Sequence, residues 1–249
     1  MKKTIRIVVE KMLNIKLFRQ PLRRGIDFYY DIDNCFGLAN FRTVFDIGAN
    51  IGQSAKVYAD RFPFSEIHSF EPVTSTFSQL QENTKSIGKR IHLVQSAMGD
   101  KEEQREIYVN KSSLHNSIVY AYPESSKELI AIDTVDAYMR RNDIKAVDFV
   151  KIDTEGYELE VIRGAEAALR SESIGVLYIE SEPTPTPRHF VPFESLRSAL
   201  SEFGYKVFGI YGQQPRFTGE KHLLFFNVAF VCDKLSEQGV SPDAYPLHG

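Results

Sequence analysis

Three carboxyl groups follow mostly apolar segments of the chain, at positions where they can do acid–base chemistry. Asp153 and Glu155 come after the run 147–152, and Glu180 comes directly after the run 174–179. Carboxylates grouped in this way can take a proton from a weak nucleophile such as a hydroxyl. They can also hold a hard divalent cation such as Mg²⁺ through oxygen ligands. We therefore treat these residues as candidate general bases and as candidate Mg²⁺ ligands.

A second interpretation of these acids remains open. Asp153 and Glu155 can complement the dipole of a helix that begins near residue 157. This explains one acid better than two, because their like charges repel. Glu182 can also take the place of Glu180 in the set.

Histidine side chains are rival bases. His115 lies in the polar loop 111–117, which is expected to follow a strand and can reach a pocket at the strand ends. The two weaker rivals of the same type are His189 and His222.

A glycine-containing turn precedes these acids and has the spacing of a nucleotide-like binding site. Asp46, Gly48, Asn50 and Gly52 follow a β-branched and aromatic run, and a helix-like segment comes next. Strand, glycine turn and helix form the unit that lets a backbone approach such a ligand. Glu71 lies 25 residues after Asp46, near the spacing at which an acid binds a ribose hydroxyl in dinucleotide-binding folds.

Apolar periodicity predicts alternating strands and helices that would bring the acidic residues to one edge of a sheet. The expected strands are 43–45, 66–70, 91–94, 104–109, 116–119, 130–134, 147–152, 174–179, 205–211 and 224–231. The expected helices are 53–59, 74–87, 135–141, 158–169 and 192–203. We therefore predict an α/β fold with a doubly wound, mostly parallel sheet of about seven strands. The last two strands have no helix between them and are expected to pair antiparallel at one edge.

The chain divides into a basic N-terminal extension at 1–40, one α/β domain at 41–233 and a tail at 234–249. Residues 1–24 have apolar positions at roughly helical spacing. They can form an amphipathic helix that contacts an acidic membrane surface or a polyanion, or a helix that caps the domain. The tyrosine-rich residues 25–40 are expected to cover the ligand pocket. The proline-rich segment 183–187 is expected to be an extended lid or edge connection.

The composition is that of an ordinary globular protein, since 43% of the 249 residues are hydrophobic and 25% are charged. The net charge of −3 gives no general case for nucleic-acid binding. Cys35 and Cys232 are too few and too far apart to predict a disulfide framework or a zinc site. No apolar run approaches the ~20 residues of a membrane helix. We expect a cytoplasmic protein, and a homo-oligomer is compatible with the sequence.

Several segments together resemble the FkbM-type methyltransferases, a family that uses S-adenosylmethionine. They are Phe45–Gly52, Phe70-Glu-Pro72, Ala97-Met-Gly-Asp100 and the stretch from Asp148 to Gly164. Their order and spacing agree with the family over roughly residues 40–182. The first two segments occur across many methyltransferases, whereas Lys151-Ile-Asp-Thr-Glu-Gly156 is more particular to this family. The regions before residue 25 and after residue 182 match weakly, and we expect substrate choice to lie there.

The resemblance implies a Rossmann-like methyltransferase fold and a cofactor site at the glycine-containing turn. Glu71 would accept hydrogen bonds from both ribose hydroxyls of S-adenosylmethionine. Gly48 would let the backbone come close, and Gly52 would belong to the same turn. Asp46 and Asn50 would orient the methionine end of the cofactor.

The resemblance also implies methyl transfer to a hydroxyl, most often on a sugar, a glycan or a polyketide-like small molecule. Ala97 and Met98 would flank the adenine. Asp153 and Glu155 would lie beside the methyl group, with Glu180 completing the set as base or Mg²⁺ ligand. Aromatic side chains that can stack on a sugar ring are Tyr29, Tyr30 and Tyr211.

The same residues bear on three alternatives to methyl transfer to a small-molecule hydroxyl. A nicotinamide dehydrogenase would share the fold, but the turn after residue 46 lacks the Gly-x-Gly-x-x-Gly fingerprint. A methyltransferase that acts on protein or nucleic acid remains open, with weak support from the basic N-terminus. A non-catalytic binding protein on the same fold is the third alternative, although such a protein is expected to have lost acids from its strand ends.

Overall fold

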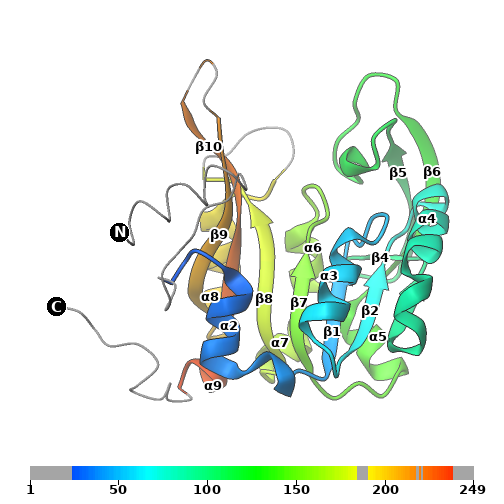
Figure 1. The fold of residues 1–249 in the computed structure, drawn as a ribbon. Helices are drawn as coiled ribbons and strands as arrows, with labels where there is room; N and C mark the ends of the chain where they lie inside the picture. The colour runs from blue at the N-terminus through cyan, green and yellow to red at the C-terminus, as the bar shows by residue number, and fades with distance from the viewer. Residues whose placement is uncertain (1–23, 184–189, 217–218, 220, 238–249) are drawn as a thin grey trace, which may run out of the picture.

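The computed structural model describes residues 24–183, 190–216, 219 and 221–237, and its centre is a seven-stranded sheet (Figure 1). The strand order is β3-β2-β1-β7-β8-β10-β9. The strands are β1 (Thr43–Ile47), β2 (Glu66–Phe70), β3 (Ile91–Val94), β7 (Val147–Ile152), β8 (Ile174–Ser181), β9 (Lys206–Arg216) and β10 (His222–Val231). The first five in spatial order are parallel, and β10 runs antiparallel to both β8 and β9. The predicted fold class is confirmed.

Helices cover both faces of this sheet, because its central strands are apolar on both sides. Val44 and Phe149 pack on one face with α2 (Phe28–Phe36) and α3 (Gln53–Arg61). Phe45 and Val150 pack on the other face. The helices there are α5 (Val135–Arg141), α6 (Glu158–Arg163), α7 (Glu166–Arg170) and α8 (Phe193–Ser201).

The chain leaves β1 toward β2 on one side and pairs β1 with β7 on the other. This is the point in an open α/β sheet where the strand order reverses. Ligands of such sheets bind outside the carboxyl ends of the strands at this point. The acids that follow β1, β2 and β7 are therefore brought to one crevice.

A second, three-stranded sheet lies beyond the carboxyl ends of β1 and β2 (Figure 1). Its strands are β4 (Ala97–Met98), β5 (Glu103–Val109) and β6 (Ser126–Asp133), in the order β4-β6-β5. The predicted strand at 130–134 thus begins earlier, at Ser126. The predicted strand at 116–119 was wrong: η3 (Ser113–His115) precedes it, and only Ser117 makes an isolated bridge, to Tyr108. The polar side chains of this segment make hydrogen bonds within the loop and to neighbouring residues, and the segment does not continue as a strand.

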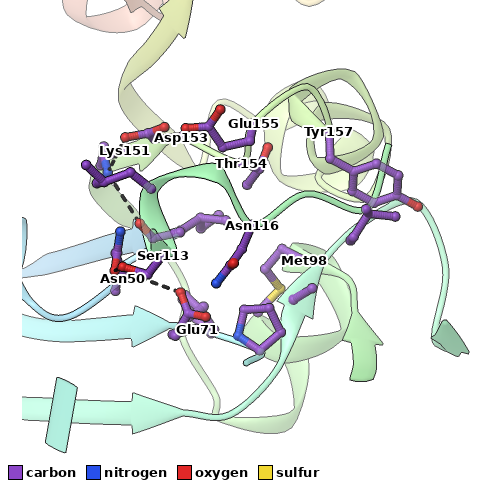
Figure 2. Close-up of a pocket in the computed structure, with 18 of the residues that line it drawn as sticks. Asn50, Glu71, Met98, Ser113, Asn116, Lys151, Asp153, Thr154, Glu155 and Tyr157 are labelled. Atoms are coloured by element: carbon purple, nitrogen blue, oxygen red, sulfur yellow. Dashed lines mark hydrogen bonds and ion pairs between the residues drawn. The ribbon is translucent and has the colours of Figure 1, made fainter. Parts of the chain in front are cut away.

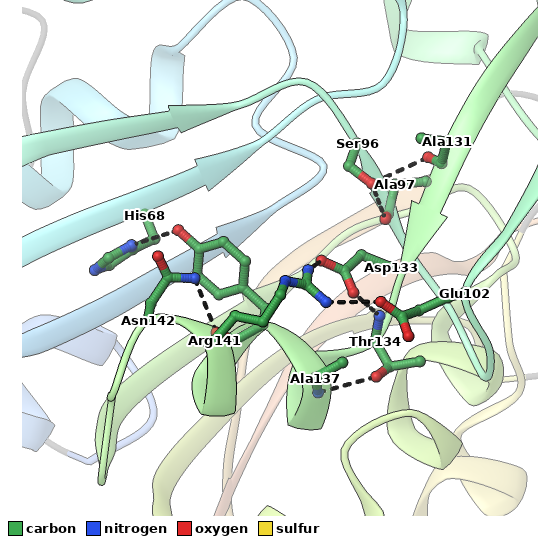
Figure 3. Close-up of polar contacts among 11 residues, drawn as sticks. His68, Ser96, Ala97, Glu102, Ala131, Asp133, Thr134, Ala137, Arg141 and Asn142 are labelled. Atoms are coloured by element: carbon green, nitrogen blue, oxygen red, sulfur yellow. Dashed lines mark hydrogen bonds and ion pairs between the residues drawn. The ribbon is translucent and has the colours of Figure 1, made fainter.

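Polar contacts attach the small sheet to both ends of α5 (Figure 3). The Thr134 hydroxyl accepts a 3.1 Å hydrogen bond from the Ala137 amide and so caps this helix. Arg141, in the last turn, pairs with Asp133 at the end of β6 and with Glu102 at a distance of 2.6 Å. These contacts join the end of β6 and the residue that precedes β5 to α5.

Two predicted helices end differently from expectation. The helix expected at 158–169 is two helices, because Gly164 ends α6 and Ala165 precedes α7. A β-carbon on Gly164 would lie 1.8 Å from the carbonyl oxygen of Gly99, so the chain near β4 passes against this break. The helix expected at 74–87 is α4 (Thr74–Thr84), and η2 (Lys85–Arg90) follows it.

Residues 25–40 were expected to cover the ligand pocket, and the structure corrects this. They form α2 and the 3-10 helix η1 (Leu38–Asn40), and Phe28 packs against Phe149 and Tyr178 in the core. A short helix, α9 (Asp233–Ser236), covers the end of the predicted domain and the start of the tail expected at 234–249.

Several predictions fall outside the described residues. They concern the basic helix and its membrane contact, most of the proline-rich segment, His189 and the end of the tail. Among the helices that the structure describes, none is long and apolar enough to cross a membrane.

Candidate active site

A cavity of about 260 Å³ opens where the ends of β1, β2 and β7 meet (Figure 2). The turn after β1, residues 48–52, forms one wall, and we name it the glycine turn. The turn after β7, residues 153–156, forms another, and we name it the acidic turn. Met98 of β4 and residues of the β5–β6 connection close the remaining side. Figure 2 shows Glu71 across the cavity from Asp153 and Glu155.

The glycine turn and the acidic turn are in direct backbone contact. Gly48 has φ of 79°, and a β-carbon there would lie 1.8 Å from the carbonyl oxygen of Asp153. Any side chain at Gly48 would therefore push the two turns apart, which is the physical need for glycine at this position. The Asp153 amide donates a 3.1 Å hydrogen bond to the carbonyl of Ile47 and holds the turns together.

Glu71 presents a fixed carboxylate to the cavity. Its Oε1 accepts a 3.0 Å hydrogen bond from the Val73 amide, and its Oε2 accepts one of 3.2 Å from the Asn50 amide. The remaining lone pairs of two oriented oxygens suit a ligand with two adjacent hydroxyls. Burial raises the pKa of Glu71 to about 7, against the opposing effect of these two amides.

Asp46 is buried and is not part of the cavity lining. Its carboxyl group is fully buried, and Oδ2 accepts a 2.7 Å hydrogen bond from the Ser54 hydroxyl. Oδ1 has no hydrogen-bond partner among the described residues and lies 4.0 Å from Nζ of Lys151. Burial raises the pKa of Asp46, while Lys151 and Ser54 act to lower it. The contact of Asp46 with a cofactor stays a prediction, and the positive charge beside Asp46 is Lys151.

The acidic turn and the end of β8 bring the three predicted carboxyl groups together. One oxygen of each of Asp153, Glu155 and Glu180 lies within 4.8 Å of the others. Asp153 and Glu155 line the cavity, and Glu180 stands beside them. Burial, Asp153 and Glu158 raise the pKa of Glu155 to about 8. Burial and the charges of Asp153 and Glu155 likewise raise the pKa of Glu180. Such a cluster requires a shared proton or a cation for stability.

Glu158 holds the acidic turn in shape. Its Oε1 accepts hydrogen bonds of 2.9 Å from both the amide and the hydroxyl of Thr154, and one of 3.3 Å from the Gly156 amide. Tyr157, the N-cap residue that precedes α6, makes no side-chain hydrogen bond to the helix. Glu158 thus holds the backbone ahead of α6. The carboxyl groups of Asp153 and Glu155 are therefore free to face the cavity.

The other predicted residues separate into those that line the cavity and those that do not. Those in the lining are Gly48, Asn50, Ala97 and Met98. Gly52 begins α3 and faces Leu80 and Thr84 instead. His115 is exposed, with its ring 5.2 Å from that of Tyr122, and is not part of the lining. Other candidates outside the lining are Tyr29, Tyr30, Tyr211, His222 and Glu182.

The β5–β6 connection contributes lining residues that the sequence did not indicate. Ser113 lines the cavity, and its hydroxyl donates a 2.7 Å hydrogen bond to Oδ1 of Asn50. Asn116 and Ile118 line it as well, and the Ser117 hydroxyl donates to the Glu155 carbonyl at 2.8 Å. The serine- and asparagine-rich composition of this loop was the available signal, but it pointed to His115.

Comparisons with known proteins show the family to which this chain is similar. The model of the methyltransferase FkbM domain matches residues 46–207. Hexuronic acid methyltransferase AglP of Haloferax volcanii is 28% identical over 149 residues, which cover 57% of each chain. Methyltransferase 1 of Beauveria bassiana is 26% identical over 162 residues, covering 54% of this chain and 64% of that protein. The matches thus span 57% and 64% of the lengths of these two curated relatives.

Among solved structures, an O-methyltransferase family protein from Burkholderia thailandensis is 13% identical, with a TM-score of 0.46. It aligns with 81% of this chain and 54% of its own. Precorrin-6y C5,15-methyltransferase from Geobacter metallireducens GS-15 is 14% identical, with a TM-score of 0.44 over 87% of this chain and 93% of its own. The FkbM match takes in the ends of β1, β2, β7 and β8, from which the cavity and its acids come. The chain belongs to the FkbM methyltransferase domain family.

Proposed function

We propose that the protein transfers a methyl group from S-adenosylmethionine to a hydroxyl of a sugar, a glycan or a related small molecule. The observation that supports this best is the pairing of two acidic sites in one cavity. Glu71 at one side suits a ribose diol, and Asp153 and Glu155 at the other suit a hydroxyl that must lose a proton. We place the reaction in the cytoplasm, where this cofactor is made.

The cavity has the chemical features that S-adenosylmethionine needs. Glu71 would hold the ribose hydroxyls, and Ala97 and Met98 would contact the adenine. Asn50 and the backbone of Gly48 would hold the amino-acid end. When bound, this cofactor supplies a methyl group on a positively charged sulfonium. The residues then have to orient the acceptor, exclude water and remove one proton.

The acidic turn would do the proton chemistry. Asp153 faces the cavity, and its Oδ2 is fixed by the ammonium of Lys151 at 2.9 Å. The Glu180 carboxyl group also hydrogen-bonds to Asp153, so a lone pair of Asp153 that neither Lys151 nor Glu180 uses would accept a hydrogen bond, and finally the proton, from the acceptor hydroxyl. Glu155 is the second candidate base, since it lines the same wall. The exposed His115 is a weaker base on this geometry.

A divalent cation is the alternative way to activate the hydroxyl. Asp153, Glu155 and Glu180 offer oxygen ligands within 4.8 Å of one another, and hard ligands of this kind suit Mg²⁺. The cation would offset the repulsion among the three carboxylates and lower the pKa of a bound hydroxyl. Activity that withstands a chelator would remove the metal from the proposal and leave the base.

The acceptor class is inferred from chemistry and from one relative. The name of the Haloferax volcanii relative gives a hexuronic acid as its substrate. For this chain we propose only the broader class, a hydroxyl on a sugar-like or related small molecule. A carboxylate base is needed most for such poor nucleophiles.

Calorimetry and methyl labelling test the proposal. Calorimetry with S-adenosylmethionine and with NAD is expected to give binding of the first alone. Incubation with methyl-labelled cofactor and separate glycan, small-molecule, protein and RNA pools is expected to label the first two. Label in protein or RNA would change the proposed acceptor class but leave the proposed methyl transfer in place. Absence of cofactor binding would contradict the proposed function as a whole.

A further inference from the structure

Lys151 joins the two turns that build the site. Its side chain is 12% exposed, and it lines the cavity. Nζ lies 2.9 Å from Oδ2 of Asp153 and 3.4 Å from the carbonyl oxygen of Gly48. One ammonium therefore contacts both the acidic turn and the glycine turn.

The third neighbour of this ammonium is Asp46. The parallel pairing of β1 and β7 sets Asp46 directly opposite Lys151, so both side chains leave the sheet on the same face. Oδ1 of Asp46 is 4.0 Å from Nζ and has no hydrogen-bond partner among the described residues. A fully buried carboxylate needs a nearby counter-charge, and Lys151 is the one that the sheet register supplies.

The charges around Lys151 also indicate that it does not repel a positively charged cofactor. Burial acts to lower the pKa of Lys151, but Asp153 and Asp46 together outweigh it and keep the amine protonated. The ammonium is bracketed by two carboxylates, so it adds little net positive charge to the cavity. It does not oppose a positively charged cofactor, and its donors are already directed at protein oxygens.

We propose that Lys151 is a positioning residue, which aims the Asp153 carboxylate at the acceptor and is itself held in place by the buried Asp46. The inference rests on the proposed methyl transfer. It assigns Asp46 a role that acts through Lys151 and Asp153 instead of through contact with the cofactor.

Crystal structures of the wild type and of Lys151→Met test the positioning role without any turnover. Met has nearly the length of Lys but no charge. The Asp153 carboxylate is therefore expected to leave its present place by more than about 1 Å, because it loses its charge-assisted hydrogen bond. A carboxylate that keeps its wild-type place would overturn the inference. Lys145→Met is the matched control, since Lys145 pairs with Asp143 at the surface.

Kinetics test the same role in the reaction. Lys151→Met is expected to lower kcat about 100-fold, the scale set by misplacing a reacting group by 1 Å. The Kd for S-adenosylmethionine, from calorimetry, is expected to stay within about threefold. Lys151→Arg keeps the charge and is expected to retain at least about tenfold more kcat than Lys151→Met. Equal losses in both variants, or a loss of cofactor affinity as large as the loss of kcat, would count against positioning.

The substitution Asp46→Asn tests independently whether Asp46 acts through Lys151. If Asp46 acts through Lys151, the double variant Asp46→Asn/Lys151→Met is expected to have the kcat of Lys151→Met alone. Additive losses of kcat would show that Asp46 acts separately from Lys151 and would overturn the role assigned to Asp46. If wild-type protein binds S-adenosylmethionine but labels no acceptor pool, the proposed function has failed. The crystallographic comparison then still decides on Lys151.

Discussion

The hydroxyl of Ser113 lies 2.7 Å from Oδ1 of Asn50, and this hydrogen bond ties the β5–β6 connection to the glycine turn. Asn50 also donates its backbone amide to Glu71. A single residue of the glycine turn thus joins the loop that closes the cavity to the acid that would hold the ribose.

Ser113→Ala is expected to weaken binding of S-adenosylmethionine about fivefold. One net hydrogen bond is worth ~1 kcal/mol, and its loss frees the connection from the glycine turn. Calorimetry measures the change. Ser112→Ala is the matched control, because Ser112 is exposed and makes no cap on η3. Equal affinities for Ser113→Ala and wild type would contradict the role of this contact.

Glu71→Gln is expected to weaken cofactor binding by at least about tenfold, since hydrogen bonds to a charged acceptor are worth 1.5 kcal/mol or more. An amide offers one acceptor oxygen in place of two. Calorimetry again gives the affinity, with Glu82→Gln on the exposed side of α4 as control. Unchanged affinity would remove Glu71 from the cofactor site.

Cofactor affinity is expected to rise with pH through about 7. The pKa of Glu71 is raised to about 7 by burial, and only its ionised form accepts hydrogen bonds from two hydroxyls. Below that pH the proton must first leave, so affinity falls. Titrations between pH 5.5 and 8.5 follow the effect, and Glu71→Gln should flatten this part of the curve. A wild-type affinity that falls as pH rises would reverse the assigned sign.

Asp153→Asn is expected to lower kcat by at least about 100-fold, as loss of a general base or a metal ligand does. The Kd for S-adenosylmethionine should stay within about threefold, because the amide has the same shape. His115→Ala, the rival base, should keep its activity. Treatment with a chelator then separates the two uses of the carboxylates. Retained turnover in Asp153→Asn would sink the assignment of this residue.

Glu158 is expected to make folding stability depend on pH. Its pKa is raised to about 7 by burial, above the ordinary value of 4.5. A raised carboxyl pKa means that the folded protein holds the proton more tightly, so stability falls as pH rises from about 4.5 through 7. The effect is on the order of 2–3 kcal/mol for this group. Thermal unfolding at pH 5.5 and pH 8 should show a smaller difference in Glu158→Gln. An unchanged difference would refute the contribution.

The central sheet and the grouping of its acids could be predicted from the sequence, because both follow from short apolar runs and from what comes after them. Val147–Ile152 was predicted to the residue, and Asp153 and Glu155 therefore had to stand at its carboxyl end. How deeply each acid is buried was harder to predict. Asp46 also stands near a strand end, yet it is fully buried and outside the lining, where it pairs across β1 and β7 with Lys151.

The small sheet and its connection could not be predicted in the same way. The first residues of β6, Ser-Lys-Glu, are polar, so they carry no apolar period, and their pairing with β5 is made across the long connection. The break at Gly164 had a local signal in the glycine itself. Its cause, the close approach of Gly99, is a contact between residues far apart in the chain.

The small sheet has its own cluster of apolar side chains, among them Ile107, Ile130 and Ile132. The cluster holds the two ends of the connecting segment, while Ser113 and Ser117 tie its middle to the glycine turn and to the acidic turn. Substitutions and changes of length in such a surface connection disturb the supporting core little. Under the proposed function, drift at the positions of this segment other than Ser113 and Ser117 would alter the acceptor while the ties to the two turns stay constant, so one scaffold would serve different acceptors.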